Sequence, residues 1–224
     1  AHEHRLVYDC EHQTLLPGTL RRREAQPPCA DADVNRAYEA AGTTYEFYRT
    51  VFGRDSLDGH GKHLISSVHY GVEFDNASWD GAQMVYGDGD GVMFRSFTLF
   101  LDVVAHELTH GVTQHEANLT YSGQSGALNE SISDVFGIQV KQFALNLDVT
   151  RSDWLIGADI VGPALKPALR SMKAPGTANP HDTQPADMDG YVQGGDVHTN
   201  SGIPNRAFYT VAATLGGHAW DRAG

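Results

Sequence analysis

Two histidines four residues apart, His106 and His110, place the strongest constraint on how this chain folds. Residues at this spacing lie on one face of an α-helix about one turn apart, so both imidazoles can reach a single metal ion. The flanking sequence favours a helix over about 97–115, because apolar residues recur there at every fourth position. These residues are Phe100, Val104, Leu108 and Val112.

Three acidic residues complete the pattern around the two histidines. Glu107 projects about 100° around the helix from His106, where a general base for a metal-bound water stands. Glu130, on the next predicted helix, offers a carboxylate as third ligand, and two histidines with one glutamate are the ligands of a catalytic zinc ion. Asp134, one turn later, can accept the remaining N–H of a zinc-bound histidine. Taken singly, Glu130 and Asp134 would be interpreted as a solvated helix face.

The composition of the 224 residues is that of a globular protein, with 41% apolar and 20% charged residues. The net charge of −12 comes from 28 acidic and 16 basic side chains, which argues against nucleic acid or an anionic membrane as partner. No apolar run approaches the roughly twenty residues that span a membrane. The chain opens on Ala1 without the basic and apolar segments of a signal peptide, so we expect the signal peptide to lie outside it.

The elements expected along the chain predict an α+β fold. A helix over about 31–52 can be capped by Asp31 or Asp33, strand-like segments fill 64–94, and the histidine helix follows. We expect a loop at 123–126, a long loop over 162–196 and a helix restarting near 205–215. The helix over about 127–146 is expected to bury a stripe of Leu128, Ile132, Phe136 and Val140.

Cys10 and Cys29 are the two cysteines of the chain. Two thiols cannot build a tetrahedral zinc site, and the chain has no C-x-x-C redox motif. We predict one disulfide closing the N-terminal loop, with two free thiols as the alternative.

Several separate motifs, in order and spacing, resemble the thermolysin family of metallopeptidases. They are Asn76-Ala77 and the segments 84–91, 106–113 and 126–137, and the likeness runs from about Asp31 to Trp220. The resemblance implies a two-lobed α+β fold with the zinc site in the cleft. Residues 1–120 would form a β-containing lobe ending in the histidine helix, and 121–224 a helical lobe that we expect to be incomplete. The short N-terminus is closer to the protealysin-like branch.

The resemblance also implies roles for further residues. Tyr121 and His198 would donate to the developing oxyanion, Arg170 would hold the substrate carbonyl, and Asn76 and Ala77 would pair with an extended substrate. The wall of an apolar pocket for a large residue after the cut would comprise Phe94, Phe97, Val103, Ile156, Ile160 and Leu169.

The function implied is that of a zinc-dependent endopeptidase cutting on the amino side of large hydrophobic residues, through a zinc-bound water that Glu107 activates. The resemblance implies protein or peptide substrates, its own propeptide as an inhibitor, a monomer, and secretion, with signal and propeptide outside this chain. One zinc ion is expected.

The paired calcium site of thermolysin is expected to be absent, while calcium elsewhere stays open. Asp102 and Asp153 remain, but Lys141, Leu155 and Ala158 stand where the family pattern places carboxylates. We expect Lys141 to supply a positive charge in place of the ions and to pair with Asp102.

The chain departs from the family at Gln193, which replaces the aspartate five residues before His198. We expect Asp196 to reach the ring instead, because two glycines before it let the loop rearrange. In the alternative, Asp196 points away and no carboxylate stabilises the protonated ring.

Three other functions remain to be weighed. A zinc aminopeptidase would carry a Gly-x-Met-Glu-Asn stretch, which is missing from this sequence, and a metzincin would have a third histidine where Glu116 stands. A binding module that keeps zinc for structure is disfavoured by Glu107, Tyr121 and His198.

Overall fold

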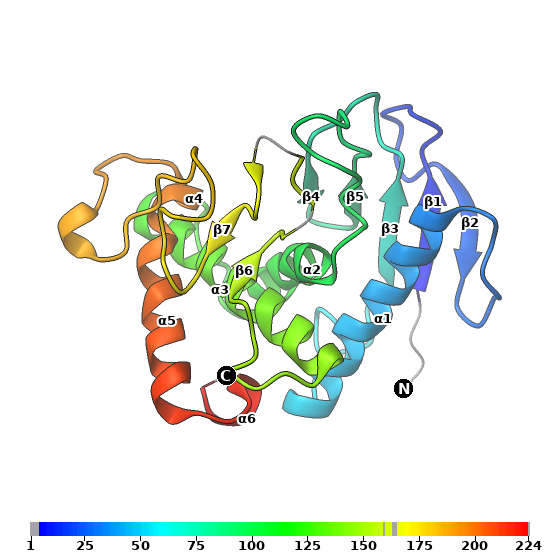
Figure 1. Cartoon of the computed structure of the whole chain (residues 1–224). Coiled ribbons are helices and arrows are strands. Elements are labelled where there is room, and N and C mark those ends of the chain that lie inside the picture. The colour runs from blue at the N-terminus through cyan, green and yellow to red at the C-terminus, as the bar shows by residue number, and fades with distance from the viewer. Residues whose placement is uncertain (1–4, 159, 163–164, 224) are drawn as a thin grey trace.

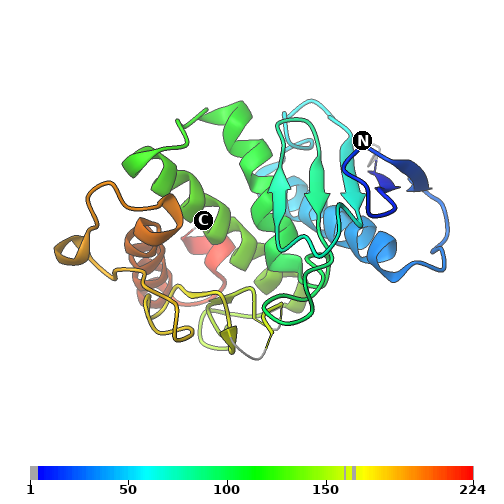
Figure 2. The same cartoon turned by 90° about the horizontal axis from the view of Figure 1, so that it is seen from above.

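A computed structural model describes residues 5–158, 160–162 and 165–223. A five-stranded sheet with helix α1 occupies one side of the molecule and helices α3 to α6 the other, as Figure 1 shows. Seen from above, α2 and α3 lie between the sheet and α5 (Figure 2). This central helix pair carries the histidine motif and Glu130, so the candidate site lies where the two sides meet.

The sheet has the order β2-β1-β3-β5-β4. Its strands are β1 (Arg5–Asp9), β2 (Thr19–Arg23), β3 (Leu64–Val68), β4 (Ala77–Trp79) and β5 (Met84–Tyr86). β1 and β3, and β3 and β5, pair in parallel, whereas β2 and β4 pair antiparallel to their neighbours. The strand-like segment expected at 64–94 therefore resolves into three short strands, and β4 forms one edge of the sheet.

Helix α1 (Ala32–Phe52) confirms the helix predicted over about 31–52, and it covers the sheet. The Asp31 side chain caps it by accepting from the backbone N–H groups of Asp33 and Val34. It ends at Gly53, whose φ of 65° suits a residue without Cβ. The core beneath it includes Val34, Ala37, Tyr38, Ala41 and Tyr45, together with side chains of β1, β3 and β5.

The remaining elements form the helical side. They are α2 (Leu101–Glu116), α3 (Gly123–Leu145), β6 (Leu155–Ile156), β7 (Arg170–Ser171), the 3₁₀ turn η2 (Met188–Gly190), α4 (Val197–Asn200), α5 (Gly202–Leu215) and α6 (Ala219–Arg222). None of the helices in the described part of the chain combines the length and apolarity needed to cross a bilayer.

Helix α3 differs from the expectation in two respects. It begins at Gly123, so the predicted loop at 123–126 is wrong. A Cβ on Gly126 would lie 2.5 Å from Val197 Cγ1, so this turn packs too closely for a larger residue. The predicted apolar stripe is also partly wrong: Leu128 is 47% exposed, whereas the polar side chains of Glu130 and Asp134 are fully buried.

The predicted disulfide is wrong, because both cysteines are free. Cys10 lies just after β1 with its thiol buried and directed at the backbone oxygen of Pro17, 3.7 Å away. Cys29 precedes α1, and its sulfur lies 3.6 Å from the oxygen of Asp31. The two thiols thus engage different backbone segments, and burial raises the pKa of the Cys10 thiol.

Outside the candidate site, His69 bridges two acidic residues from separate segments. Its Nδ1 lies 2.8 Å from Asp88 Oδ1 and its Nε2 lies 3.0 Å from Asp31 Oδ2. His12 also lies 3.5 Å from Asp88. The Asp88 carboxylate, together with Asp31, raises the pKa of His69 to about 9, although burial opposes the shift. Protonated His69 therefore ties the cap of α1 to the turn after β5.

We expect this bridge to make stability depend on pH. The pKa of His69 rises from 6.5 in the unfolded chain to about 9 in the folded one, so its contribution is complete below pH 6.5 and disappears as pH rises through 9. The shift sets an upper limit of about 3 kcal/mol, and solvent contact reduces the expected effect to about 1.5 kcal/mol.

The measurement compares melting temperatures of the wild type and His69→Asn between pH 6 and 10. Asn tolerates the positive φ of 53° at this position. At pH 6 the variant should melt about 5 °C lower, and the difference should vanish near pH 10. His12→Asn, which removes a mostly exposed ring, is the control. A difference that stays constant over the whole range would show that His69 contributes only packing.

Candidate metal centre

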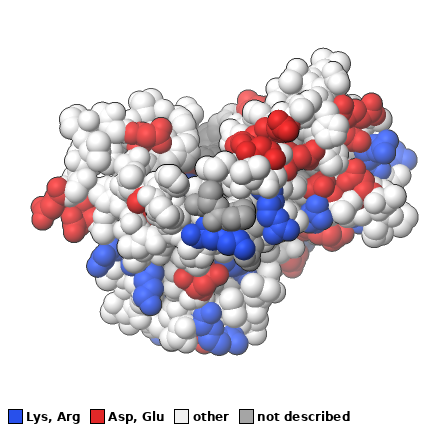
Figure 3. All heavy atoms as spheres, turned by 45° about the horizontal axis from the view of Figure 1, so that its top comes forward, with Lys and Arg blue, Asp and Glu red and all other residues white. Residues whose placement is uncertain are grey.

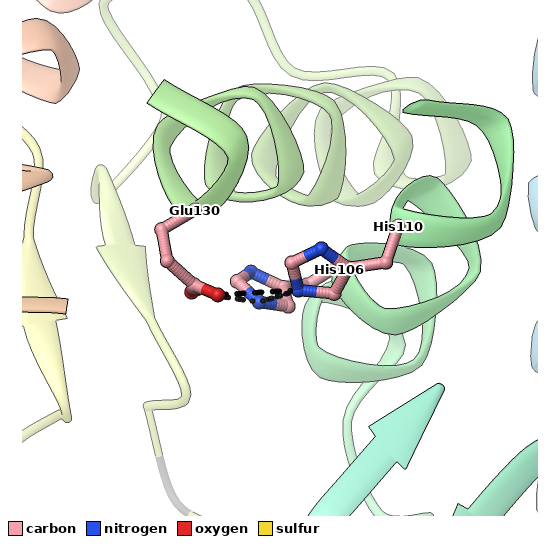
Figure 4. Close-up of side chains that lie close together, drawn as sticks. All are labelled: His106, His110 and Glu130. Carbon is pink, nitrogen blue, oxygen red and sulfur yellow. Dashed lines mark hydrogen bonds and ion pairs between the residues drawn. The ribbon is translucent and has the colours of Figure 1, made fainter. Parts of the chain in front are cut away.

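Three side chains from the two central helices converge on one point, as Figure 4 shows. His106 and His110 project from α2, and their Nε2 atoms are 3.1 Å apart. Glu130 projects from α3, with carboxylate oxygens 3.3 Å from His106 Nε2 and 3.4 Å from His110 Nε2. All three donor atoms lie within 4.8 Å of one another, so the three residues identified from the sequence form one group that could hold a metal ion.

The surroundings of these donors fit a divalent cation. Glu130 is fully buried, and its Oε2 has no hydrogen-bond partner among the described residues. A buried carboxylate oxygen that accepts no hydrogen bond is costly unless a cation compensates it. Two imidazole nitrogens and one carboxylate, with a side open to a cavity, are the ligand set of a catalytic zinc site and not of a closed structural one.

The second nitrogen of each histidine is held by a polar neighbour on α3. His106 Nδ1 donates to Asp134 Oδ1 over 2.8 Å, as expected from the sequence. His110 Nδ1 donates to Asn129 Oδ1 over 2.7 Å, with Ser133 Oγ at 3.1 Å. When each ring is neutral with its proton on Nδ1, as metal binding requires, its Nε2 lone pair faces the metal position.

Asn129 and Ser133 were not identified from the sequence. The signal that could have found them is the requirement that each metal-binding histidine has an acceptor for its other nitrogen. Asn129 precedes Glu130 directly, and Ser133 follows it by three residues on the same helix.

The carboxylates and the cationic side chains of the group stabilise each other's charged forms. Burial alone would lower the pKa of His106, but the Asp134 and Glu130 carboxylates outweigh it and raise the value to about 10. Burial would raise the pKa of Glu130, yet the two histidines hold it well below its usual range. The pKa of Asp134 is likewise low despite its burial, because Arg170 and His106 surround it. Both carboxylates are therefore ionised in this arrangement.

Glu107 lies beside the metal position and is not one of the three converging donors. It lines both cavities that meet at the site. Burial raises its pKa, and His106 and His110 oppose that rise. A partly exposed carboxyl group next to the ligands has the placement expected of a general base.

Tyr121 and His198 lie next to each other beside the Glu130 carboxylate. The Tyr121 hydroxyl donates to Glu130 Oε1 and lies 3.4 Å from His198 Nε2. His198 Nδ1 is 2.8 Å from Asp196 Oδ1, which confirms the expectation that Asp196 reaches the ring. Asp196 also caps α4 by accepting from the His198 backbone N–H, so one carboxylate fixes both the backbone and the ring.

Arg170, on β7, forms a two-pronged contact with Asp134. Its Nε lies 2.9 Å from Asp134 Oδ2 and its Nη2 lies 2.7 Å from Oδ1. The guanidinium is thereby fixed at the rim of the smaller cavity. It can still present its remaining N–H groups to a bound carbonyl.

Two cavities meet at the ligands. The larger, of about 510 Å³, runs from Asn76, Ala77 and Trp79 past the ligands to Tyr121 and His198. The smaller, of about 100 Å³, is lined by four of the six expected pocket residues, Phe97, Val103, Ile156 and Leu169. The expected roles of Phe94 and Ile160 are not supported, because they are absent from this lining. Phe94 stacks against Phe97 at 5.4 Å between ring centroids, and Ile160 is fully buried in the core.

Comparison with known families agrees with this geometry. The model of the thermolysin metallopeptidase catalytic domain matches residues 7–114, and that of the thermolysin metallopeptidase alpha-helical domain matches residues 117–224. An extracellular metalloprotease of Pectobacterium carotovorum subsp. carotovorum is 52% identical over 98% of the chain. Thermolysin of Alicyclobacillus acidocaldarius subsp. acidocaldarius is 44% identical over 92% of the chain.

The chain spans 66% of the Pectobacterium protein, 63% of protease PrtS of Photorhabdus and 38% of the Alicyclobacillus thermolysin. Among solved structures, the precursor of protealysin, a metalloproteinase from Serratia proteamaculans, superposes with a TM-score of 0.96 and 52% identity. This similarity covers 99% of the chain and 72% of that structure, and it confirms the expected two-lobed α+β fold. The chain therefore belongs to the thermolysin metallopeptidase family.

Proposed function

We propose that the chain is a zinc-dependent endopeptidase that cuts on the amino side of large hydrophobic residues. The observation that carries this proposal is the convergence of His106, His110 and Glu130 on one point, with Glu107 beside them. When bound there, a zinc ion polarises the scissile carbonyl and lowers the pKa of water to about 7.

The residues around the ligands transfer the proton and stabilise the negative charge that develops on the carbonyl oxygen. Glu107 takes a proton from the attacking water and delivers it to the leaving amine, in line with its place on the cavity wall. Tyr121 and His198 donate hydrogen bonds to the carbonyl oxygen as it becomes negative. Burial and the Glu130 charge raise the pKa of Tyr121, so its hydroxyl remains protonated and able to donate. Asp196 keeps the His198 ring in place for this contact.

The shape of the cleft supports an extended peptide as substrate. β4 is an edge strand, and Asn76 and Ala77 at its start line both cavities. An extended peptide can bind along such an edge through its backbone. Arg170 at the rim would hold a substrate carbonyl, and the smaller cavity would take the side chain after the cut.

The test is cleavage of a peptide of about ten residues, blocked at both ends, with one internal Phe. We expect a product that begins with Phe, and replacing Phe by Ala should lower kcat/KM by about 10- to 100-fold, through the lost apolar burial. An aminopeptidase would leave the blocked peptide intact, and a binding module would cut neither form. Cleavage at bonds unrelated to Phe would contradict the proposed specificity.

We further infer secretion, a monomeric state and inhibition by a propeptide. The printed names of relatives, an extracellular metalloprotease and a protealysin precursor, support the first and the last. On the face in Figure 3, acidic side chains gather over the side with the five-stranded sheet, and several basic side chains lie near the middle of the view. The net charge of −12 favours peptides over polyanions as partners.

We propose that Lys141 takes the place of the paired calcium ions of thermolysin. Its Nζ lies 3.1 Å from both carboxylate oxygens of Asp153, 3.3 Å from the oxygen of Leu155 and 4.0 Å from Asp102 Oδ2. The closer contact is with Asp153, and the expected pairing with Asp102 is the longer one. Because the Lys141 ammonium group already compensates the negative charge of these carboxylates, calcium binding at this position would add little stability.

Calcium should accordingly leave the melting temperature nearly unchanged through this site. The measurement is thermal unfolding with and without millimolar calcium, for the wild type and for Lys141→Gln, which removes the cation. We expect a shift below about 1 °C in the wild type and a larger one in the variant. A strong calcium response in the wild type that Asp102→Ala removes would contradict the substitution.

A further inference from the structure

The carboxylate of Asp134 is fully buried and accepts four hydrogen bonds. Its Oδ1 accepts from His106 Nδ1 and from Arg170 Nη2, over 2.8 and 2.7 Å. Its Oδ2 accepts from Arg170 Nε over 2.9 Å and from the Asn205 amide over 2.8 Å. Each oxygen thus has two donors, which is its full capacity. The Asn205 contact comes from α5, far along the chain from α2 and α3, which carry the three converging donors.

Asn205 itself is fully buried, and its amide oxygen has no hydrogen-bond partner among the described residues. An unpaired buried amide oxygen costs about 1–3 kcal/mol, whereas an apolar side chain would fill the space without that cost. The amide nitrogen makes one hydrogen bond, and that bond is to the carboxylate behind a metal ligand. The location of this cost indicates a role at the site.

Asn205 also stands close behind His198 in the chain. α4, which carries His198, runs through Ser201 directly into α5, and the Asn205 N–H donates to the Ser201 oxygen over 3.1 Å. The Ser201 hydroxyl in turn donates to the His198 oxygen over 2.9 Å. One short segment therefore positions His198 directly and His106 through Asp134.

We propose that Asn205 is a positioning residue of the metal centre, which couples the docking of α5 on α3 to the orientation of His106 and hence to metal affinity. The inference rests on the proposed zinc site. Arg170 reaches Asp134 from a two-residue strand with a long side chain, whereas Asn205 reaches it with a short side chain from a 14-residue helix. The short contact fixes the rotation of the carboxylate, so that Oδ1 stays directed at His106. Because coupling between sites is reciprocal, bound zinc should also stabilise the docking of α5.

The first test is the zinc dissociation constant of metal-free protein, measured by competition with a chromophoric chelator. Changes in the residues behind a metal-binding histidine typically weaken affinity 10- to 100-fold, and we expect about tenfold for Asn205→Ala. Gln142→Ala is the matched control. Gln142 is also a fully buried helical amide whose oxygen has no hydrogen-bond partner in the described part of the chain, but its amide nitrogen donates to Ser152 and not to Asp134. Its zinc affinity should equal that of the wild type.

A double-mutant cycle then tests the route. If Asn205 acts through Asp134, Asn205→Ala should change zinc affinity by less than about twofold in an Asp134→Asn background. Equal losses in both backgrounds would overturn the proposed route. If Asn205→Ala binds zinc as tightly as the wild type and only melts at a lower temperature, Asn205 stabilises the fold and does not position the metal ligand.

Hydrogen exchange in the wild type covers the case in which the variant does not fold. Removing zinc should accelerate amide exchange in α5 more than in α1, which lies on the sheet. Equal acceleration in the two helices would overturn the coupling. A wild-type chain that binds no zinc would instead refute the proposed function, so the two failures are distinguishable.

Discussion

Replacement of Glu107 by Gln should leave zinc bound and lower kcat for peptide hydrolysis by about 10³-fold. Gln has nearly the same shape but cannot accept a proton, and positioned proton transfer contributes 10² to 10⁴ in rate. Glu107 lines both cavities without belonging to the three converging donors, so metal binding should not depend on its charge. The measurements are kcat with the blocked peptide and zinc content by mass spectrometry.

Glu116→Gln is the matched control for this variant. Glu116 lies at the end of the same helix, is exposed, and pairs with Arg54. It should retain full activity. Loss of zinc in Glu107→Gln, or an unchanged kcat, would show that Glu107 is a ligand or a bystander.

Tyr121→Phe and His198→Gln should each lower kcat by about 10²-fold with little change in KM. Both side chains donate to an oxygen that becomes negative only in the transition state, and removing one such donor costs 10² to 10³ in kcat. The hydroxyl and the ring lie 3.4 Å apart at the mouth of the ligand group, so one oxygen can contact both.

Asp196→Asn provides the graded control for this pair. Asn can still accept the hydrogen bond from His198 Nδ1 but lacks the charge, so we expect a loss smaller than that of His198→Gln. If Tyr121→Phe and His198→Gln raise KM and leave kcat unchanged, the two residues bind substrate and do not stabilise the transition state.

Local patterns were sufficient to predict the elements that bring the ligands together. The cap at Asp31 and the apolar spacing of α1 depend on neighbours within one helix, and the structure reproduces them. The same holds for Val104 and Leu108 on α2, both of which are buried. The i,i+4 spacing of His106 and His110 is itself a property of the helix, so their convergence follows once the helix forms.

The buried polar face of α3 could not be predicted in this way. Periodicity assigned burial to Leu128 because it is apolar, yet the helix turns Glu130 and Asp134 inward, where His106, Arg170 and Asn205 compensate them. Those partners come from other parts of the chain. Spacing along a single helix carries no information about them.

Distant packing also explains the other differences from expectation. Two cysteines nineteen positions apart suggest a short loop, but β1 and the segment before α1 direct the thiols to different oxygens. Phe94 and Ile160 are apolar, yet neither lines the smaller cavity: Phe94 stacks on Phe97, and Ile160 is fully buried in the core. In each case the residue type was right for the proposed role and the side chain's direction was set by tertiary contacts.

The most direct test of the zinc site is anomalous X-ray scattering at the zinc absorption edge from crystals of the chain. We predict one peak per molecule, about 2.0–2.2 Å from His106 Nε2, His110 Nε2 and a carboxylate oxygen of Glu130. A peak at another cluster, such as Asp31, Asp33 and His69, with none between these three ligands, would contradict the assignment.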